Sequence, residues 1–139
     1  NKINAYFGGE LHGKTIAFWG LSFKPNTDDM REAPSVVIAN LLLDAGAHVR
    51  AYDPVAMEEA KHQLGDRITY CTDEMEAVCG ADALALITEW AEFRVPDWSN
   101  VAKEMNGKVL FDGRNLYRSE IVAEVGFDYF GIGQGEQPV

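Results

Sequence analysis

Residues 14–45 read KTIAFWGLSFKPNTDDMREAPSVVIANLLLDA, and the order of their properties decides the fold. The first seven residues are apolar and rich in strand formers, which predicts a strand covered on both faces. Residues 35–45 are almost wholly apolar, with Pro34 before them and Gly46 after them, a pattern typical of a helix. A strand, a loop and a helix in this order indicate the first part of a βαβ unit.

The same alternation continues to the end of the chain. Further strands are predicted at residues 48–53, 68–71, 81–88, 108–112 and 129–132. Helical spacing or capping residues predict helices after Met57, Asp73, Asp97 and around Ile121. Strands that alternate with helices require a parallel sheet. We therefore expect an α/β fold, a Rossmann-like three-layer sandwich with a mostly parallel sheet.

Length and charge limit the class of protein. The 139 residues suit one domain, and the formal charge of −10 argues against nucleic-acid or membrane partners. No apolar run approaches the roughly 20 residues that span a bilayer, and the start lacks a secretory signal, so a cytoplasmic location is expected. We expect a domain at residues 14–133, a remnant of an upstream linker at 1–13 and a frayed tail at 134–139.

The chain has two cysteines, which are too few for a disulfide framework. Cys71 and Cys79 lie apart from any histidine in the sequence, and we expect both to be reduced core residues with no metal site. The three histidines are scattered and are expected at the surface; they are His12, His48 and His62.

The loop after the first strand is the main candidate for a ligand site. Ligands of open parallel sheets bind beyond the carboxyl ends of the strands. Residues 22–34 form a thirteen-residue connection, whereas such connections usually need about two to six. This loop holds Lys24 and Arg31 in an acidic chain, and Arg114 follows the fifth strand at the same edge.

Three cations beside the start of a helix suit a phosphate or diphosphate, because guanidinium groups and helix N–H groups satisfy its oxygens. The alternative is that Lys24 and Arg31 pair with the acids of the same loop in a solvated surface segment; these acids are Asp28, Asp29 and Glu32. The loop carries no G-x-G-x-x-G fingerprint, since it has the single glycine Gly20, so the usual dinucleotide-binding turn is absent.

Four ordered motifs resemble a known family. They are GLSFKPNTDDMREAPS at residues 20–35, AYDP at 51–54, TEW at 88–90 and FDGRN at 111–115. They are similar to the C-terminal, UDP-binding domain of the UDP-glucose/GDP-mannose dehydrogenase family, in its UDP-glucose 6-dehydrogenase branch. The resemblance covers about residues 11–133.

The resemblance implies a reaction and residue roles. Whole members oxidise UDP-glucose to UDP-glucuronate with two NAD, which an N-terminal domain binds, and they use a cysteine that neither Cys71 nor Cys79 matches. Phe23, Lys24 and Arg114 would contact the nucleotide-sugar, and Arg31 would reach the NAD. The resemblance also implies a homodimeric whole protein, no catalytic residue in this chain, and no dehydrogenase activity of the chain by itself.

Two other classes remain as alternatives. A phosphoacceptor signalling domain would use Asp53, at the end of the second strand, as its acceptor. That class needs further acids after the first strand and a lysine after the fifth, where this chain has Trp19-Gly20 and Arg114. A module that serves only oligomerisation is the other alternative, and stabilisation by a ligand would argue against it.

Overall fold

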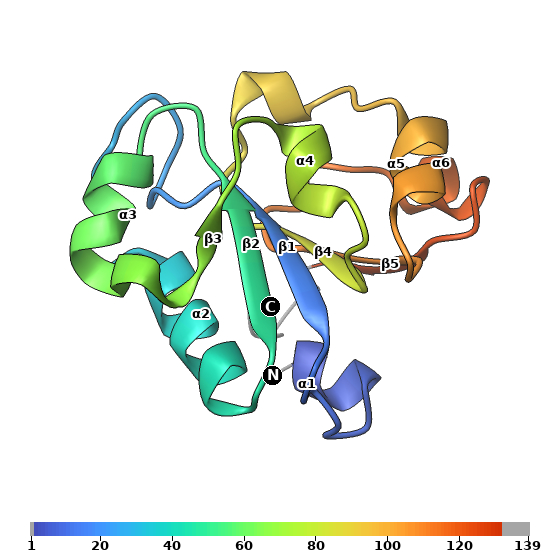
Figure 1. Ribbon diagram of the computed structural model, residues 1–139. Helices are drawn as coiled ribbons and strands as arrows, with labels where there is room; N and C mark the ends of the chain where they lie inside the picture. Colours follow the sequence, from blue (N-terminus) through green and yellow to red (C-terminus); the bar gives the residue numbers. More distant parts are fainter. Residues whose placement is uncertain (1, 132–139) are drawn as a thin grey trace.

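The computed structural model describes residues 2–131, which form three layers with a twisted sheet between two sets of helices (Figure 1). All strand pairs are parallel, and the order is β3-β2-β1-β4-β5-β6. The strands are β1 (Thr15–Trp19), β2 (His48–Tyr52), β3 (Thr69–Tyr70), β4 (Ala83–Leu86), β5 (Val109–Asp112) and β6 (Asp128–Gly131). The Rossmann-like α/β fold predicted from the sequence is confirmed.

Helices cover both faces of the sheet. They are α1 (Lys2–Tyr6), α2 (Pro34–Asp44), α3 (Met57–Leu64), α4 (Glu74–Val78), α5 (Trp98–Glu104) and α6 (Ser119–Ala123), with short 3-10 turns η1 (Gly65–Arg67) and η2 (Ala91–Phe93). Helices α1, α2 and α3 pack into one hydrophobic cluster, and α4, α5 and α6 pack into a second on the other face. Strands β1, β4 and β5 contribute to both clusters, which explains their continuous apolar sequences.

Two helix starts follow the capping residues expected from the sequence. The Asp73 carboxylate accepts from the Glu76 N–H at 2.7 Å, and Asp97 accepts from the Asn100 N–H at 3.2 Å. Each bond satisfies one of the amide groups that a helix start leaves unpaired.

The segment before β1 is packed into the first cluster. Ile3 and Leu11 are buried, and the Tyr6 ring lies edge-on to Phe111 and Phe130. The boundary expected at residue 13 stays a prediction, but this segment contributes core residues. The expected tail at 134–139 lies outside the described residues.

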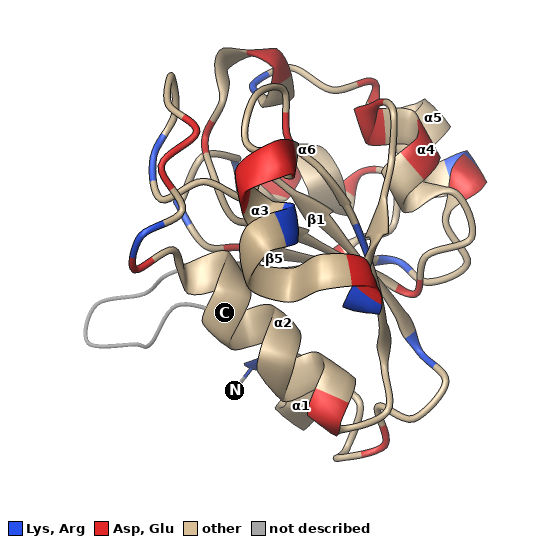
Figure 2. Ribbon diagram, turned by 60° about the vertical axis from the view of Figure 1, so that its left-hand side comes forward, with Lys and Arg blue, Asp and Glu red and all other residues tan. Residues whose placement is uncertain are grey.

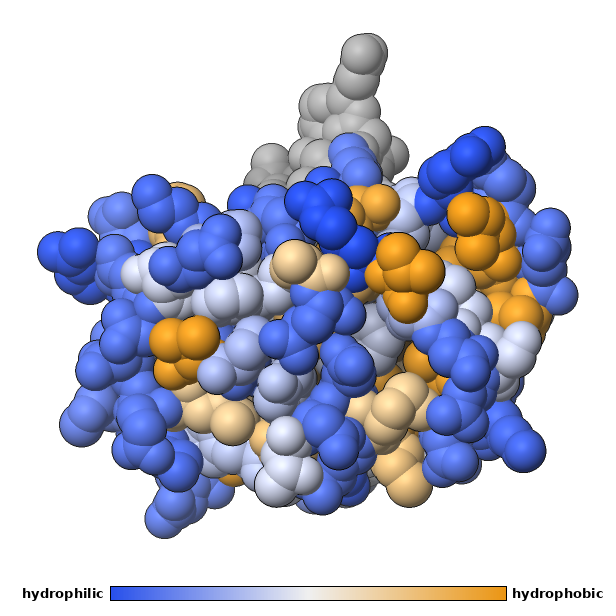
Figure 3. Space-filling model, turned by 90° about the horizontal axis from the view of Figure 1, so that it is seen from above, coloured by the Kyte–Doolittle hydropathy of each residue, from blue (hydrophilic) through white to orange (hydrophobic). Residues whose placement is uncertain are grey.

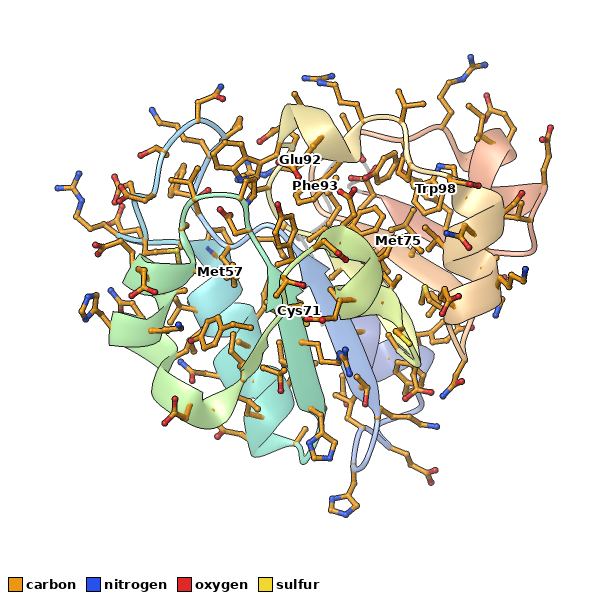
Figure 4. The ribbon with its side chains drawn as sticks, turned by 45° about the horizontal axis from the view of Figure 1, so that its top comes forward. Met57, Cys71, Met75, Glu92, Phe93 and Trp98 are labelled. Carbon is orange, nitrogen blue, oxygen red and sulfur yellow. The ribbon has the colours of Figure 1, made fainter. Side chains whose placement is uncertain are left out.

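The free cysteines differ in exposure. Cys71 is buried at the end of β3, where burial raises the pKa of its thiol (Figure 4). Cys79 is exposed, so the expectation that both are core residues is wrong for Cys79, which lies just past the end of the short α4. All three histidines are exposed, as expected. None of the helices in the described part of the chain combines the length and hydropathy that crossing a membrane requires.

Candidate functional site

The strand order reverses between β1 and β4, and this switch point positions the candidate site. From β1 the chain continues to one side of the sheet through β2, and from β4 it continues to the other side through β5. A crevice forms at such a reversal, beyond the carboxyl ends of the strands. These ends lie at the top of Figure 1, and Figure 3 looks onto them. The loops after β1, β4 and β5 therefore meet there.

Gly20 lets the first loop lie directly on the loop after β4. Its φ is +94°, and a Cβ at this position would lie 2.5 Å from the Thr88 Cβ. Thr88 also donates its hydroxyl to the Ser22 carbonyl at 2.6 Å. A larger residue at position 20 would force these two loops apart, so the glycine is a packing requirement as well as a conformational one.

The buried side chain of Asp53, which follows β2, hydrogen-bonds to the loops after β1, β2 and β4. This side chain is fully buried, and its Oδ2 accepts from the Leu21 N–H at 2.8 Å, the Ser22 N–H at 3.1 Å and the Trp90 indole at 3.1 Å. Its Oδ1 accepts from the amides of residues 55 and 56 at 2.9 and 2.7 Å. A carboxylate buried and bonded in this way is inaccessible to a phosphodonor, which argues against the signalling alternative.

Asp112, the last residue of β5, shapes the third loop. Its Oδ1 accepts from the Arg114 N–H at 3.0 Å, and its Oδ2 accepts from the Tyr117 N–H and the Tyr129 hydroxyl, both at 2.8 Å. Burial, together with the bond to this carboxylate, raises the pKa of Tyr129, so its hydroxyl stays a donor at neutral pH. The bonds to Asp112 therefore fix the conformation of the turn that carries Arg114.

Arg114 lies between the loops after β1 and β4. Its Nε donates to the Ile87 carbonyl at 2.9 Å, and an Nη2 donor bonds to the Phe23 carbonyl. The Glu89 Oε1 lies 3.8 Å from the Arg114 Nε. The guanidinium therefore joins the two loops of the crevice and is also a partly exposed cation at that point.

The first loop forms an open hollow of about 540 Å3, which brings together three of the four predicted site residues. The lining residues are Phe23, Lys24, Asp29, Arg31 and Glu32. Phe23 exposes 41% of its surface, and among the described residues the Lys24 ammonium makes no hydrogen bond or ion pair. Figure 3 shows apolar patches in a mostly hydrophilic surface on this side of the molecule. Arg114 does not line the hollow but donates to the main-chain carbonyl of Phe23, which does.

Arg31 is paired within the loop. Its Nε and Nη2 donate to the two carboxylate oxygens of Asp29, each at 3.0 Å, while its side chain remains 88% exposed. The bonds from Arg31 lower the pKa of Asp29 to about 2. The pairing that the sequence left as an alternative is therefore present for Arg31. Figure 2 shows basic and acidic segments close together along the loops at the top of the molecule.

The start of α2 does not reach this hollow. Ser35 lies in its first turn, is fully buried, and donates its hydroxyl to the Leu21 carbonyl at 2.6 Å. The Leu21 main chain thus packs against the first turn of α2, and no residue of α2 lines the hollow. The anion site expected from the sequence would have to rest on side-chain cations rather than on the amides of α2.

Backbone strain within residues 2–131 concentrates in these loops. Three residues other than glycine have a positive φ, and all lie in the loops after β1 and β5; they are Asn26, Glu32 and Asn115. Such conformations are held in place by the surrounding structure and are frequent at binding sites.

Sequence reasoning missed the buried residues that hold the loops together. Asp53, Thr88 and Asp112 are all fully buried polar residues at or next to strand ends. A signal was available, because a polar residue that ends an apolar strand can accept or donate to the loop amides beside it. The motifs AYDP, TEW and FDGRN each contain one of these residues.

Comparison with known proteins adds independent information. The sequence model of the UDP-glucose/GDP-mannose dehydrogenase family, UDP binding domain, matches residues 17–119. The chain is 47% identical over 137 residues to a UDP-glucose 6-dehydrogenase of Pseudomonas aeruginosa, covering 95% of this chain. A solved UDP-glucose dehydrogenase from Pyrobaculum islandicum superposes with a TM-score of 0.77 at 35% identity, over 94% of this chain.

A solved NDP-N-acetyl-D-galactosaminuronic acid dehydrogenase from Methanosarcina mazei superposes with a TM-score of 0.80 at 26% identity, over 94% of this chain. These relatives are much longer. The chain spans 30% of the Pseudomonas protein, 28% of the Pyrobaculum chain and 27% of the Methanosarcina chain.

Proposed function

The chain belongs to the UDP-glucose/GDP-mannose dehydrogenase family as its UDP binding domain, and from this we propose that it holds a UDP-sugar above the carboxyl ends of β1, β4 and β5. The observation that carries the proposal is the hollow of about 540 Å3, lined by Phe23 and Lys24 and backed by Arg114. These three residues are proposed to contact the nucleotide-sugar.

Each contact has a physical basis. The exposed ring of Phe23 offers an apolar surface on which the uracil or the ribose can pack. The exposed ammonium of Lys24 is available to a phosphate oxygen, and the guanidinium of Arg114 adds a second positive charge from the adjacent loop. In a chain of net charge −10, these two cations would offset the repulsion between the acidic surface and a diphosphate.

For the whole protein we propose the oxidation of UDP-glucose to UDP-glucuronate with two NAD, in line with the names of its relatives. The residues of this domain do not fit a dinucleotide held at the first loop, because the only glycine of that turn, Gly20, packs against Thr88. NAD, which accepts hydride when bound, is therefore proposed to sit mainly on another domain. The exposed Arg31 is the residue of this chain that is proposed to contact that NAD.

These assignments give this chain a role in binding. This chain binds and orients the UDP part of the substrate, and no catalytic residue is assigned to it. We propose residues 14–133 as the UDP-sugar-binding domain, a homodimer as the working form of the whole protein, and the cytoplasm as its location. UDP-glucose and UDP-glucuronate are the proposed ligands, and neither nucleic acid nor membrane is a proposed partner.

Titration with UDP, followed by amide chemical shifts, tests the binding proposal on the chain itself. Affinity is expected to be weak, about 1 mM or near −4 kcal/mol, because other parts of a longer enzyme would add contacts. Residues 22–34 and 113–115 should shift first. Shifts confined to the opposite edge of the sheet would refute the assignment, and NADH formation from UDP-glucose and NAD by this chain would refute the absence of catalytic residues.

A further inference from the structure

Glu89, in the loop after β4, has an unusual environment beside Arg114. Its Oε1 is buried, yet it accepts no hydrogen bond from any residue in the part of the chain that the structure describes. The nearest cationic atom is the Arg114 Nε at 3.8 Å. That nitrogen has one hydrogen, which it donates to the Ile87 carbonyl at 2.9 Å. The contact between the Glu89 Oε1 and the guanidinium is therefore an ion pair without a hydrogen bond.

This arrangement has two consequences for an incoming ligand. The carboxylate offsets the charge of Arg114, so a diphosphate that approaches Arg114 also approaches a negative group. The Glu89 side chain also keeps 29% of its surface exposed, so its carboxylate can accept a hydrogen bond from a ligand that brings a hydroxyl or N–H next to Arg114.

We infer that Glu89 determines which anions the site accepts, an inference that rests on the proposed binding of a UDP-sugar. It disfavours a bare diphosphate and favours a diphosphate that carries a hydrogen-bond donor next to its phosphates. A nucleotide-sugar has this chemistry, since the ribose and the sugar place hydroxyl groups on both sides of the diphosphate. Glu89 is a specificity-determining residue in this assignment, and Arg114 supplies the attraction.

The test compares the binding of inorganic diphosphate and of UDP by amide chemical shifts. Glu89→Gln keeps the shape of the side chain and removes its charge. It should bind inorganic diphosphate about tenfold more tightly than the unaltered chain, an effect of about 1.4 kcal/mol. UDP should gain less, so the preference for UDP over diphosphate should fall severalfold.

Glu92→Gln is the matched control. Glu92 lies three residues further along, is exposed, and accepts from the Tyr52 hydroxyl at 3.1 Å (Figure 4). Glu92→Gln makes the same change in net charge, but it leaves the pair of Glu89 and Arg114 intact. The variant should therefore prefer UDP over diphosphate as strongly as the unaltered chain does. Glu89→Asp, which retains the charge, should also keep most of the preference and provides a second variant if the amide disturbs folding.

The outcomes separate two failures. If the unaltered chain binds UDP but Glu89→Gln and Glu92→Gln change diphosphate binding equally, net charge explains the effect and the role of Glu89 is wrong. If the unaltered chain shows no shifts at residues 22–34 and 113–115 with UDP, the proposed UDP site itself fails, and the role of Glu89 fails with it.

Discussion

The candidate UDP site has a buried floor and an exposed rim, and the two are built by opposite means. The floor consists of fully buried polar residues, namely Ser22, Asp53, Thr88 and Asp112. The rim consists of exposed residues, namely Phe23, Lys24 and Arg31. In the floor each side chain bonds to main-chain groups of the loops, whereas in the rim the only side-chain bonds within residues 2–131 are those between Arg31 and Asp29.

The family motifs therefore contain two kinds of residue: those that hold the loops together and those proposed to contact the ligand. Within GLSFKPNTDDMREAPS, Ser22 belongs to the floor and Lys24 to the rim, two positions apart. Arg114 belongs to both, because it bonds to two main-chain carbonyls and keeps a partly exposed guanidinium. Substitutions in the floor should therefore change stability, and those in the rim should change binding.

The largest expected effect is in the floor. Asp53→Ala would leave the buried amides of Leu21 and Ser22 and the Trp90 indole without an acceptor. The free energy of unfolding should fall by about 3–5 kcal/mol, the scale of removing one partner from a buried charged network. Urea unfolding measures this loss. The exposed Asp66→Ala is the control, and an equal, small loss in both variants would show that the floor does not hold the loops.

Arg114→Lys tests the residue shared by floor and rim. Lysine keeps the charge and loses the planar fork, so UDP affinity should fall by about 1.5 kcal/mol, roughly tenfold. The loss of the two bonds to main-chain carbonyls should lower stability by about 1 kcal/mol. Shift titration and urea unfolding measure the two effects. Arg67→Lys, at an exposed arginine after α3, should change neither; unaltered UDP binding by Arg114→Lys would remove Arg114 from the site.

The floor and the rim also differ in how far the sequence predicts them. The strands, the long first loop and its cations follow from apolar runs, loop length and charge, which are local properties. The bonds of Asp53 and Arg114 depend on which loops meet, and that follows from the strand order and from the close packing of Gly20 on Thr88. Similarly, the pairing of Arg31 with Asp29 depends on a loop conformation that includes a positive φ at Asn26 and Glu32.

A smaller effect is expected in the rim itself. Lys24→Met keeps the length of the side chain and removes an exposed charge, so UDP affinity should fall by about 1 kcal/mol, roughly fivefold, and stability should not change. Because the interaction is exposed, added salt should reduce the difference between the two proteins. Lys61→Met, at an exposed lysine of α3 that pairs with Glu58, is the control. A loss of stability without a loss of UDP affinity would show that Lys24 stabilises the fold and does not contact UDP.

The smallest expected effect on UDP binding is that of Arg31→Ala, because Arg31 is proposed to face NAD on another domain and is already bonded to Asp29. The substitution should instead change the pKa of Asp29 measurably. That pKa is lowered to about 2 from an ordinary 3.8, so any contribution of the pair to stability is present above the ordinary value and is lost as the pH falls toward the lowered one. Without the Arg31 side chain, the pKa of Asp29 should rise toward its ordinary value but stay below it, because the main-chain N–H of residue 31 still donates to the Asp29 carboxylate; carboxyl shifts followed from neutrality down to about pH 3 would detect the rise. Arg118→Ala, which breaks the comparable exposed pair with Glu120, should leave Asp29 unchanged. If Arg31→Ala weakens UDP binding as much as Arg114→Lys does, Arg31 contacts the substrate, and the rim faces one ligand instead of two.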